Sequence, residues 1–380
     1  MFLSEKIAFI GIGQCGGNIV KDLEDVTSKY LGGEHDIQSY YVNTSIDDLE
    51  ATDAPLNRRY HISGTQGMAK DHKYAFEVIT KDDNDAKVAE AIYGRYANAK
   101  MYFLVFSSSG GTGGGMANAI AKKLKEYYPE KIINAVVVKP HDEEDMKMQY
   151  NAKNCLATVK QYIDDGYYTS IQLLDNNKFE FNKKLELNKR YVRTLTKIIH
   201  LDVISKEGNL DDEEMERLFS RVGMVSFHEV SNKDFETLIT KYENNSMFFK
   251  QRKTAKTHGL ILNPKNNTIE ARNMIREQFG VPMESHHILW DEDTNIIITS
   301  AIEFSDDVLN NLAANYNKLK KMRDDISNSY NNESFVEVTA DFSDMVEQER
   351  QPKETVIIPT NNVISRGRRG KKLQGLLDLD

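Results

Sequence analysis

Residues 101–115 read MYFLVFSSSGGTGGG, an apolar run followed at once by serines and glycines. The apolar run predicts a buried strand, and the next segment, Met116–Tyr128, has the apolar periodicity of a helix. Glycine lets a backbone approach a phosphate closely, and the free N–H groups at the start of a helix stabilise its negative charge. This strand–loop–helix unit therefore predicts an α/β fold with a phosphate site.

A second loop of the same kind lies near the N-terminus. The segment GIGQCGGN, residues 11–18, follows the apolar run Ile7–Ile12 and opens a helix. By itself this GxGxxG pattern is typical of dinucleotide binding. A dinucleotide site also needs an acidic residue that ends the second strand and holds a ribose, but this chain has Val42-Asn43-Thr44-Ser45 there. Two glycine-rich turns on one sheet can instead hold one polyphosphate from two sides.

Neither loop contains the GxxxxGK[ST] pattern of a P-loop, and no lysine in them is placed to neutralise phosphates. A bound nucleoside triphosphate therefore needs Mg²⁺ for charge neutralisation. No Cys/His cluster is visible, and we expect the phosphates, rather than protein side chains, to hold this ion.

The remaining pattern predicts two domains and a tail. Short apolar runs alternate with amphipathic stretches in the first half, which is typical of a parallel sheet covered on both faces. A long helical pattern runs over 183–203, and a smaller mixed α/β domain follows it. After about residue 328 the chain becomes polar and contains Pro352 and Pro359, which indicates a disordered tail. The expected boundaries are 1–182 for the nucleotide domain, 183–206 for a central helix, 207–328 for the second domain and 329–380 for the tail.

The expected elements follow from the same pattern. The predicted strands are Ile7–Ile12, Ser39–Val42, Met101–Phe106, Ile132–Val138, Ser170–Leu174, Gly259–Leu262, His287–Trp290 and Asn295–Ala301. Besides Met116–Tyr128 and the central helix, the predicted helices are Met146–Ile163, Thr268–Gln278 and Asp306–Met322.

The glycine loops resemble those of the tubulin/FtsZ superfamily. Ser109–Gly115 is similar to the signature GGGTG(S/T)G, with Ser109 in place of the first glycine and Gly114 in place of the hydroxyl residue. The GQCG run resembles the first nucleotide loop of tubulin. The resemblance covers about residues 5–325 and implies a Rossmann-like GTPase domain. It also implies GTP and GDP as ligands, Mg²⁺ beside them, and head-to-tail assembly into filaments.

The resemblance further implies which residues bind the nucleotide. Residues 63–67 fall where the family has its γ-phosphate-sensing loop, and Glu144 falls where an acid contacts the ribose. Met148 stands where FtsZ has an arginine, and Asn176 matches an asparagine that reads guanine. The implied set is Gly13, Gln14, Cys15, Asn18, Asn43, Gly64, Thr65, Gly67, Ser109, Gly110, Gly111, Thr112, Gly113, Gly114, Glu144 and Asn176.

The central helix supplies the candidates for contact with the base. Tyr191 is the candidate to stack on guanine, and Asn188 or Thr196 is the candidate polar contact. A core position for Tyr191 is the alternative interpretation. Cys15 is expected to be a small residue beside the nucleotide with no catalytic role.

The segment EGNLDDEEM, residues 207–215, resembles the synergy loop NxDxx(D/E) of the family, with Asn209, Asp211 and Glu214 at the matching positions. GTP hydrolysis needs a water aligned behind the γ-phosphate, and a nearby carboxylate can align it. In this family the carboxylate comes from the next subunit, so the resemblance implies that these three residues are catalytic on a neighbour's GTP. The alternative is an acidic helix start exposed to solvent.

Bulk composition narrows the remaining classes. The formal net charge of −9 argues against a protein that binds nucleic acid over its whole surface. Two cysteines cannot make a disulfide framework, no apolar run is long enough to span a bilayer, and no signal peptide is visible. We therefore expect a cytoplasmic protein.

The loops and the segment LLDNNK resemble the TubZ-like partition proteins of plasmids and phages most closely. This implies a role in DNA segregation, with a DNA-binding adaptor that docks on the tail. The tail has a basic cluster, Arg366–Lys372, and spaced apolar residues over Leu373–Leu379. A merely solubilising tail is the alternative, and five cations give little direct affinity for DNA at physiological salt.

Other functions stay open at this point. A cell-division or phage-centring filament would share the chemistry and differ in its partners. A filament protein that hydrolyses GTP poorly fits the substitutions at Ser109, Gly114 and Met148. An NAD-dependent oxidoreductase built on Gly11–Gly16 would leave the second glycine loop and the acidic loop unexplained.

Overall fold

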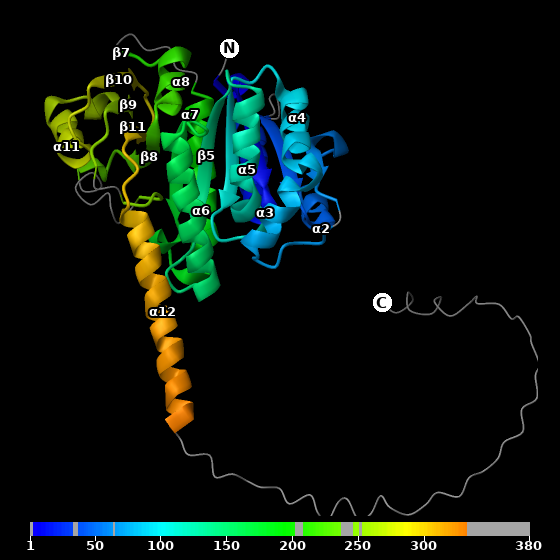
Figure 1. The fold of residues 1–380 in the computed structure, drawn as a ribbon. Helices are drawn as coiled ribbons and strands as arrows, with labels where there is room; N and C mark the ends of the chain where they lie inside the picture. The colour runs from blue at the N-terminus through cyan, green and yellow to red at the C-terminus, as the bar shows by residue number, and fades with distance from the viewer. Residues whose placement is uncertain are drawn as a thin grey trace, which may run out of the picture. The chain divides into compact units, whose positions relative to one another are not determined.

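The computed structural model describes residues 3–32, 37–63, 65–201, 208–236, 246–250 and 253–332. Residues 1–326 form one compact unit, drawn in Figure 1. Its described strands make one sheet of eleven strands, in the order β3-β2-β1-β4-β5-β6-β8-β11-β9-β10-β7. The predicted tail, with its basic cluster and apolar end, lies outside the described residues from position 333 onward.

The first six strands are parallel; five of them were predicted from their apolar runs, and β3 was not predicted. They are β1 (Ile7–Ile12), β2 (Gln38–Asn43), β3 (Arg59–His61), β4 (Met101–Ser107), β5 (Ile132–Lys139) and β6 (Ser170–Asp175). The connecting helices are α1 (Gly13–Tyr30), α2 (Ile46–Glu50), α3 (His72–Thr80), α4 (Asn84–Tyr96), α5 (Gly111–Tyr127) and α6 (Met146–Asp164), and α7 (Lys184–Ile199) is the central helix.

Alternation along each strand divides the core into two layers. Ile7 and Phe9 pack with the apolar faces of α1 and α7, whereas Ala8 and Ile10 pack with α3, α4, α5 and α6. Both faces of the parallel sheet are therefore covered, and the loops at the carboxyl ends of the strands are left to form a site.

The second half of the chain extends the same sheet. Strand β8 (Gly223–Ser231) pairs in parallel with β6, and β11 (Thr294–Ile302) pairs antiparallel with both β8 and β9 (Thr257–Leu262). The other elements are β7 (Gly208–Asn209), α8 (Asp212–Ser220), α11 (Ile269–Phe279), β10 (Glu284–Leu289) and α12 (Asp307–Asn332). Helix α8 packs with the α7 layer, and α11 covers the other face of β8, β9 and β11.

The described residues also form short 3-10 turns at Leu3–Lys6, Leu56–Arg58, Lys81–Asp83, Asn176–Lys178, Phe181–Lys183 and Pro264–Asn266. The α/β class with a mostly parallel Rossmann-like sheet is confirmed. The run GMVSFHEV, which received no assignment from the sequence, is strand β8. One expectation needs correction. The helix expected to end at Met322 continues to Asn332, because polar residues without glycine or proline do not end a helix.

Candidate functional site

The two glycine loops lie against each other. A Cβ at Gly13, whose φ is +71°, would come 2.9 Å from the backbone nitrogen of Gly113, and a Cβ at Gly113 would come 2.9 Å from the carbonyl oxygen of Ile12. Helices α1 and α5 therefore begin side by side. The residues that precede them, Ile12 and Gly110, make no side-chain cap hydrogen bond, whereas Asp71, Asp145 and Asp211 cap α3, α6 and α8. Two adjacent uncapped helix starts suit one polyphosphate.

Part of the glycine pattern serves packing. A Cβ at Gly16 would lie 1.9 Å from the carbonyl oxygen of Val105 in β4, so only glycine lets α1 approach the sheet here. A Cβ at Gly114 would lie 2.6 Å from the ring of His72, and one at Gly111 would lie 2.6 Å from Cβ of Met68. Gly114 thus faces α3, and its lack of a hydroxyl leaves room for His72.

The segment after β2 closes the site on another side. The hydroxyls of Thr44 and Thr112 are 2.7 Å apart, which ties this segment to the start of α5. Oδ1 of Asn43 accepts hydrogen bonds from the backbone nitrogens of Thr44 and Ser45 at 2.8 and 3.2 Å. The Asn43 side chain therefore holds the turn that carries Thr44.

Asp48 joins this segment to the first glycine loop. Its carboxylate accepts from Nδ2 of Asn43 at 3.2 Å and from Nε2 of Gln14 at 3.4 Å. Gln14 and Asn18 are both exposed on α1. Asp48 was not among the residues predicted from the sequence, although it lies five residues after Asn43.

The predicted third loop lies beside Thr44. The backbone nitrogen of Gly67, whose φ is +92°, donates to the Thr44 carbonyl at 3.3 Å, and the Thr65 hydroxyl donates to the Ile62 carbonyl at 3.0 Å. Gly64 lies outside the described residues. The loop therefore lies against the segment after β2 that carries Thr44.

The chain that follows the third loop is strained and packs on α5. Ala69 and Lys70 have φ values of 45° and 58°, a left-handed conformation that costs energy outside glycine and is frequent at functional sites. His72 lies with Nε2 2.9 Å from the carbonyl oxygen of Gly110, and burial lowers the pKa of His72. This histidine, the first residue of α3, was not predicted from the sequence to lie beside the start of α5.

Glu144 and Cys15 lie near the start of α7. Glu144 forms an ion pair with Lys184, whose Nζ also lies 4.5 Å from the ring centroid of Phe181. Burial raises the pKa of the Cys15 thiol to about 12, with an opposing effect of the Lys184 charge. The thiol is therefore protonated at neutral pH and is a poor nucleophile.

The Asp-Asn pair after β6 belongs to a buried network. Oδ1 of Asp175 accepts from Nδ2 of Asn177 at 2.8 Å and from Nζ of the fully buried Lys139 at 3.5 Å. Asp142 is 2.9 Å from Lys139 and also accepts from Asn177. Asn177 and not Asn176 carries the contact with Asp175, and Asn176 is half-buried at the start of the turn.

The candidates on α7 separate into core and site residues. Tyr191 is 1% exposed, its hydroxyl donates to Gln172 at 2.8 Å, and its ring stacks on Phe227 at 5.5 Å. Thr196 is also buried, 3.4 Å from the hydroxyl of Thr27. The structure thus places both residues in the core. The expectation that Tyr191 stacks on guanine is corrected, and Tyr191 is a core residue.

Asn188 behaves differently. It is 7% exposed, and its buried Oδ1 has no hydrogen-bond partner in the described part of the chain. A buried acceptor without a partner costs about 1–3 kcal/mol. A ligand that donates a hydrogen bond there would remove this cost, and Asn188 remains our candidate for the base contact.

The acidic loop forms the start of α8. Asp211 is the N-cap residue and accepts from the backbone nitrogen of Glu214 at 2.8 Å, while Oε2 of Glu214 accepts from the Asp211 nitrogen at 3.2 Å. This capping box explains the Asp-x-x-Glu spacing structurally. Asn209 pairs through its backbone with His287 of β10. The three predicted catalytic residues are therefore neighbours.

Helix α8 lies at the edge of the sheet opposite the glycine loops. Glu216 of α8 pairs with Lys6, at 3.5 Å, and with Lys100, the residues that directly precede β1 and β4. The glycine loops follow the carboxyl ends of the same strands. A strand of six residues is about 20 Å long, so the acidic loop and the glycine loops of one subunit are separated by at least about that length.

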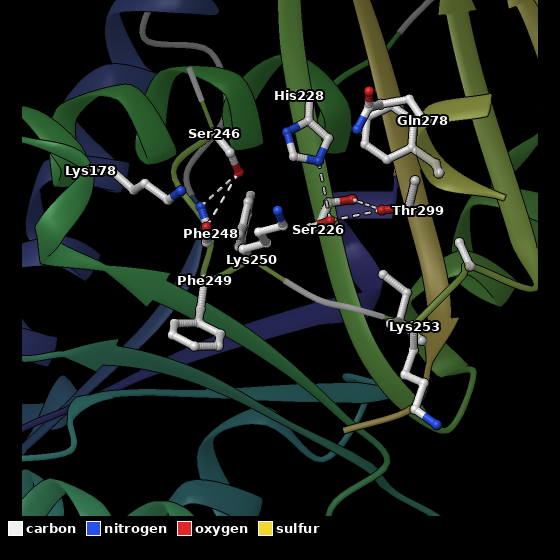
Figure 2. A pocket seen from close by; sticks show the side chains of 13 residues that line it. Lys178, Ser226, His228, Ser246, Phe248, Phe249, Lys250, Lys253, Gln278 and Thr299 are labelled. Carbon is white, nitrogen blue, oxygen red and sulfur yellow. Dashed lines mark hydrogen bonds between the residues drawn. The ribbon is translucent and has the colours of Figure 1, made fainter. Parts of the chain in front are cut away.

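A separate hollow lies between β8, β11 and residues 246–250 (Figure 2). Its volume is about 40 Å³, and Figure 2 shows His228 above Ser226, which lies 2.7 Å from Thr299. Burial lowers the pKa of His228 to about 3. No glycine loop lines this hollow, and it is far below the size of a nucleotide pocket.

Two further properties concern membranes and metals. Within the described ranges, no helix is long and apolar enough to cross a membrane. The same ranges hold no group of three or more His, Cys, Asp or Glu side chains that could hold a metal ion.

Two adjacent uncapped helix starts at the carboxyl edge of a parallel sheet define a nucleotide-binding α/β protein of the class that holds phosphates with backbone groups. Residues 6–180 match the GTPase domain of the Tubulin/FtsZ family. Residues 6–180 of this chain are therefore assigned to the Tubulin/FtsZ GTPase domain. The predicted family and enzyme class are confirmed, and the oxidoreductase alternative is set aside.

Relatives agree with this assignment. The tubulin-like protein TubZ of Clostridium botulinum C phage is 29% identical over 247 residues, which cover 65% of this chain and 66% of that relative. The tubulin-like protein CetZ of Pyrococcus abyssi is 26% identical over 275 residues, covering 67% and 71%.

Solved structures share the fold. A tail-truncated TubZ of C. botulinum phage c-st matches with a TM-score of 0.74 at 25% identity, covering 84% of this chain and 100% of that one. A protofilament of Bacillus thuringiensis serovar israelensis TubZ in its GTPγS form matches with a TM-score of 0.71 at 16% identity, covering 85% and 94%.

Proposed function

We propose that this protein is a GTPase that hydrolyses GTP only when copies stack head to tail. The observation that carries the proposal is the position of Glu216, which ties α8 to the residues before β1 and β4. The acidic loop then lies at the amino edge of the sheet, and the phosphate site lies at the carboxyl edge. Stacking along the strand direction brings the amino edge of one copy, with its acidic loop, onto the carboxyl edge of the next copy, with its phosphate site.

The chain's own residues fit GTP in this arrangement. The uncapped starts of α1 and α5 receive the phosphates, Thr44 and Thr112 close the site beside them, and Asn188 offers a buried acceptor to the base. Mg²⁺ held by the phosphates would neutralise their charge. Glu214 of the neighbouring copy, with Asp211 and Asn209 beside it, would align the attacking water behind the γ-phosphate.

The protofilament form of the B. thuringiensis TubZ supports an assembly of this kind, since that protein has the same fold. We extend the proposal to DNA segregation in the cytoplasm, because the loops and the segment LLDNNK resemble those of TubZ-like partition proteins, and a phage TubZ is among the relatives. A DNA-binding adaptor would dock on the tail. A division or phage-centring role would change the partner and leave the GTPase chemistry unchanged.

Subunit mixing tests the shared site. Gly110→Asp disables the phosphate site, and Glu214→Gln removes the acid while a glutamine still completes the capping box. Each variant alone should be inactive. In an equimolar mixture about a quarter of the interfaces combine an intact site with an intact acid, so turnover should recover to roughly that fraction.

Failure of the mixture to recover turnover would refute the shared site. If the mixture stays inactive while both variants co-sediment with wild-type polymer, the two half-sites do not meet between subunits. Wild-type turnover per protomer should also rise with protein concentration, and a constant value down to high dilution would mean a self-contained enzyme.

A further inference from the structure

We propose that His286 is a positioning residue for hydrolysis: it holds the Glu214 carboxylate in the orientation that the attacking water needs. The inference rests on the proposed function, because it assigns a role to a neighbour of the catalytic acid. Nδ1 of His286 lies 2.9 Å from Oε1 of Glu214. The two residues are 72 positions apart, on β10 and α8, so only the tertiary structure brings them together.

The Glu214 carboxylate is held at both oxygens. Oε2 accepts from the backbone nitrogen of Asp211 at 3.2 Å, and Oε1 is bound to His286. Because an ionised carboxylate only accepts, Nδ1 of His286 carries the proton of this hydrogen bond. Each carboxylate oxygen can accept a second bond, so both keep a free lone pair for water. Two fixed points set the plane of the carboxylate and therefore the direction of these lone pairs.

Helix capping does not require the histidine. The box is complete with Oε2 and the Asp211 carboxylate, and it leaves Oε1 free to rotate into solvent. The hydrogen bond to His286 fixes the second carboxylate oxygen, Oε1. A carboxylate oriented by a third group is the usual arrangement where a base must act on a defined atom.

Strand β10 fixes the acidic loop at two adjacent residues. His287 pairs with Asn209 through the backbone, and His286 binds Glu214. Both contacts are local to the catalytic segment. The side chains of Glu214 and His286 are 22% and 16% exposed, so the pair is ordered by its surroundings while the carboxylate remains accessible to a neighbouring copy.

Nε2 of His286 is buried without a hydrogen-bond partner in the described part of the chain. A buried polar atom without a partner is a cost to folding. A histidine at this place is therefore not explained by stability alone, which supports a role for its other nitrogen.

The test compares His286→Asn with His286→Gln and His286→Ala. The asparagine amide places a donor near the position of Nδ1, whereas the glutamine amide reaches toward that of Nε2. We measure kcat and KM for GTP above the assembly threshold, together with sedimented polymer and thermal stability. The alanine variant should lose about tenfold or more in kcat, with unchanged KM and polymer mass, because a misplaced group lowers the rate without affecting binding. Asparagine should restore most of kcat, and glutamine should restore little.

A kcat within twofold of wild type for His286→Ala would overturn the inference, provided that Glu214→Gln is inactive in the same assay. If Glu214→Gln itself keeps full turnover, the proposed function fails instead, so the two failures are distinguishable. If the alanine variant does not fold, the kcat values of His286→Asn and His286→Gln are compared instead. Equal kcat values for these two variants would also overturn the inference.

Discussion

Placing a negative charge at Gly110 should abolish GTP binding while the protein stays folded. Gly110 is the N-cap residue of α5, with φ −73° and ψ 153°, a conformation open to any residue. A Cβ there would meet only Ser107, at 3.7 and 3.9 Å, which is ordinary contact. Aspartate is a better N-cap residue than glycine, so Gly110→Asp should leave the free energy of unfolding unchanged or raise it by a few tenths of a kcal/mol.

The expected loss of affinity follows from the geometry. A carboxylate at this N-cap lies within about 4 Å of a phosphate bound at the helix start, and two like charges at that distance repel by about 4 kcal/mol at an effective dielectric constant of about 20. This corresponds to a dissociation constant for GTP that is about 1000-fold higher. Gly110→Asn has the same shape without the charge and should change the dissociation constant by less than about tenfold.

Isothermal titration with GTP at fixed Mg²⁺ and about 0.1 M salt measures both variants, since screening changes with salt. Urea unfolding confirms that both fold. If the aspartate variant binds GTP within about fivefold of the asparagine variant, the phosphates do not lie at the start of α5. The paired helix starts of α1 and α5 would then not be the phosphate site.

Three other outcomes concern stability. Gly16→Ala should destabilise the fold by about 3 kcal/mol or more, because the alanine Cβ would lie 1.9 Å from a carbonyl oxygen of β4. Urea unfolding measures this loss, and an unchanged midpoint would contradict the packing of α1 on β4. Asp211→Ala should lower the free energy of unfolding by about 1 kcal/mol through loss of the capping box, and urea unfolding that matched wild type would show that the box contributes nothing. Burial lowers the pKa of His228 to about 3 and of His258 to about 4 from 6.5, so the unfolded chain binds protons that the folded chain excludes. This stability is present above pH 6.5 and is lost as pH falls, by about 2 kcal/mol for each histidine between pH 6.5 and about pH 5. Urea unfolding across this pH range measures the loss. A free energy of unfolding that does not change with pH would refute it.

Local patterns predicted the parts of the site that lie on one stretch of chain. The two glycine loops and the acidic loop were found because backbone contact with phosphate and the start of a helix each leave a short signature. Tyr191 shows the limit of this reasoning. A tyrosine on an amphipathic helix has the same local signature in a core and in a base-stacking site, and only its contact with Gln172 and Phe227 decides between them.

The sequence by itself determined the α/β class, the parallel nucleotide domain and the family, since strand and helix periodicity and glycine spacing are local properties. The tertiary structure decided the rest. It placed Asp48 and His72 beside the glycine loops, set α8 at the far edge of the sheet through Glu216, and brought His286 to Glu214. These contacts join segments whose pairing depends on strand order and helix packing, which no local pattern encodes.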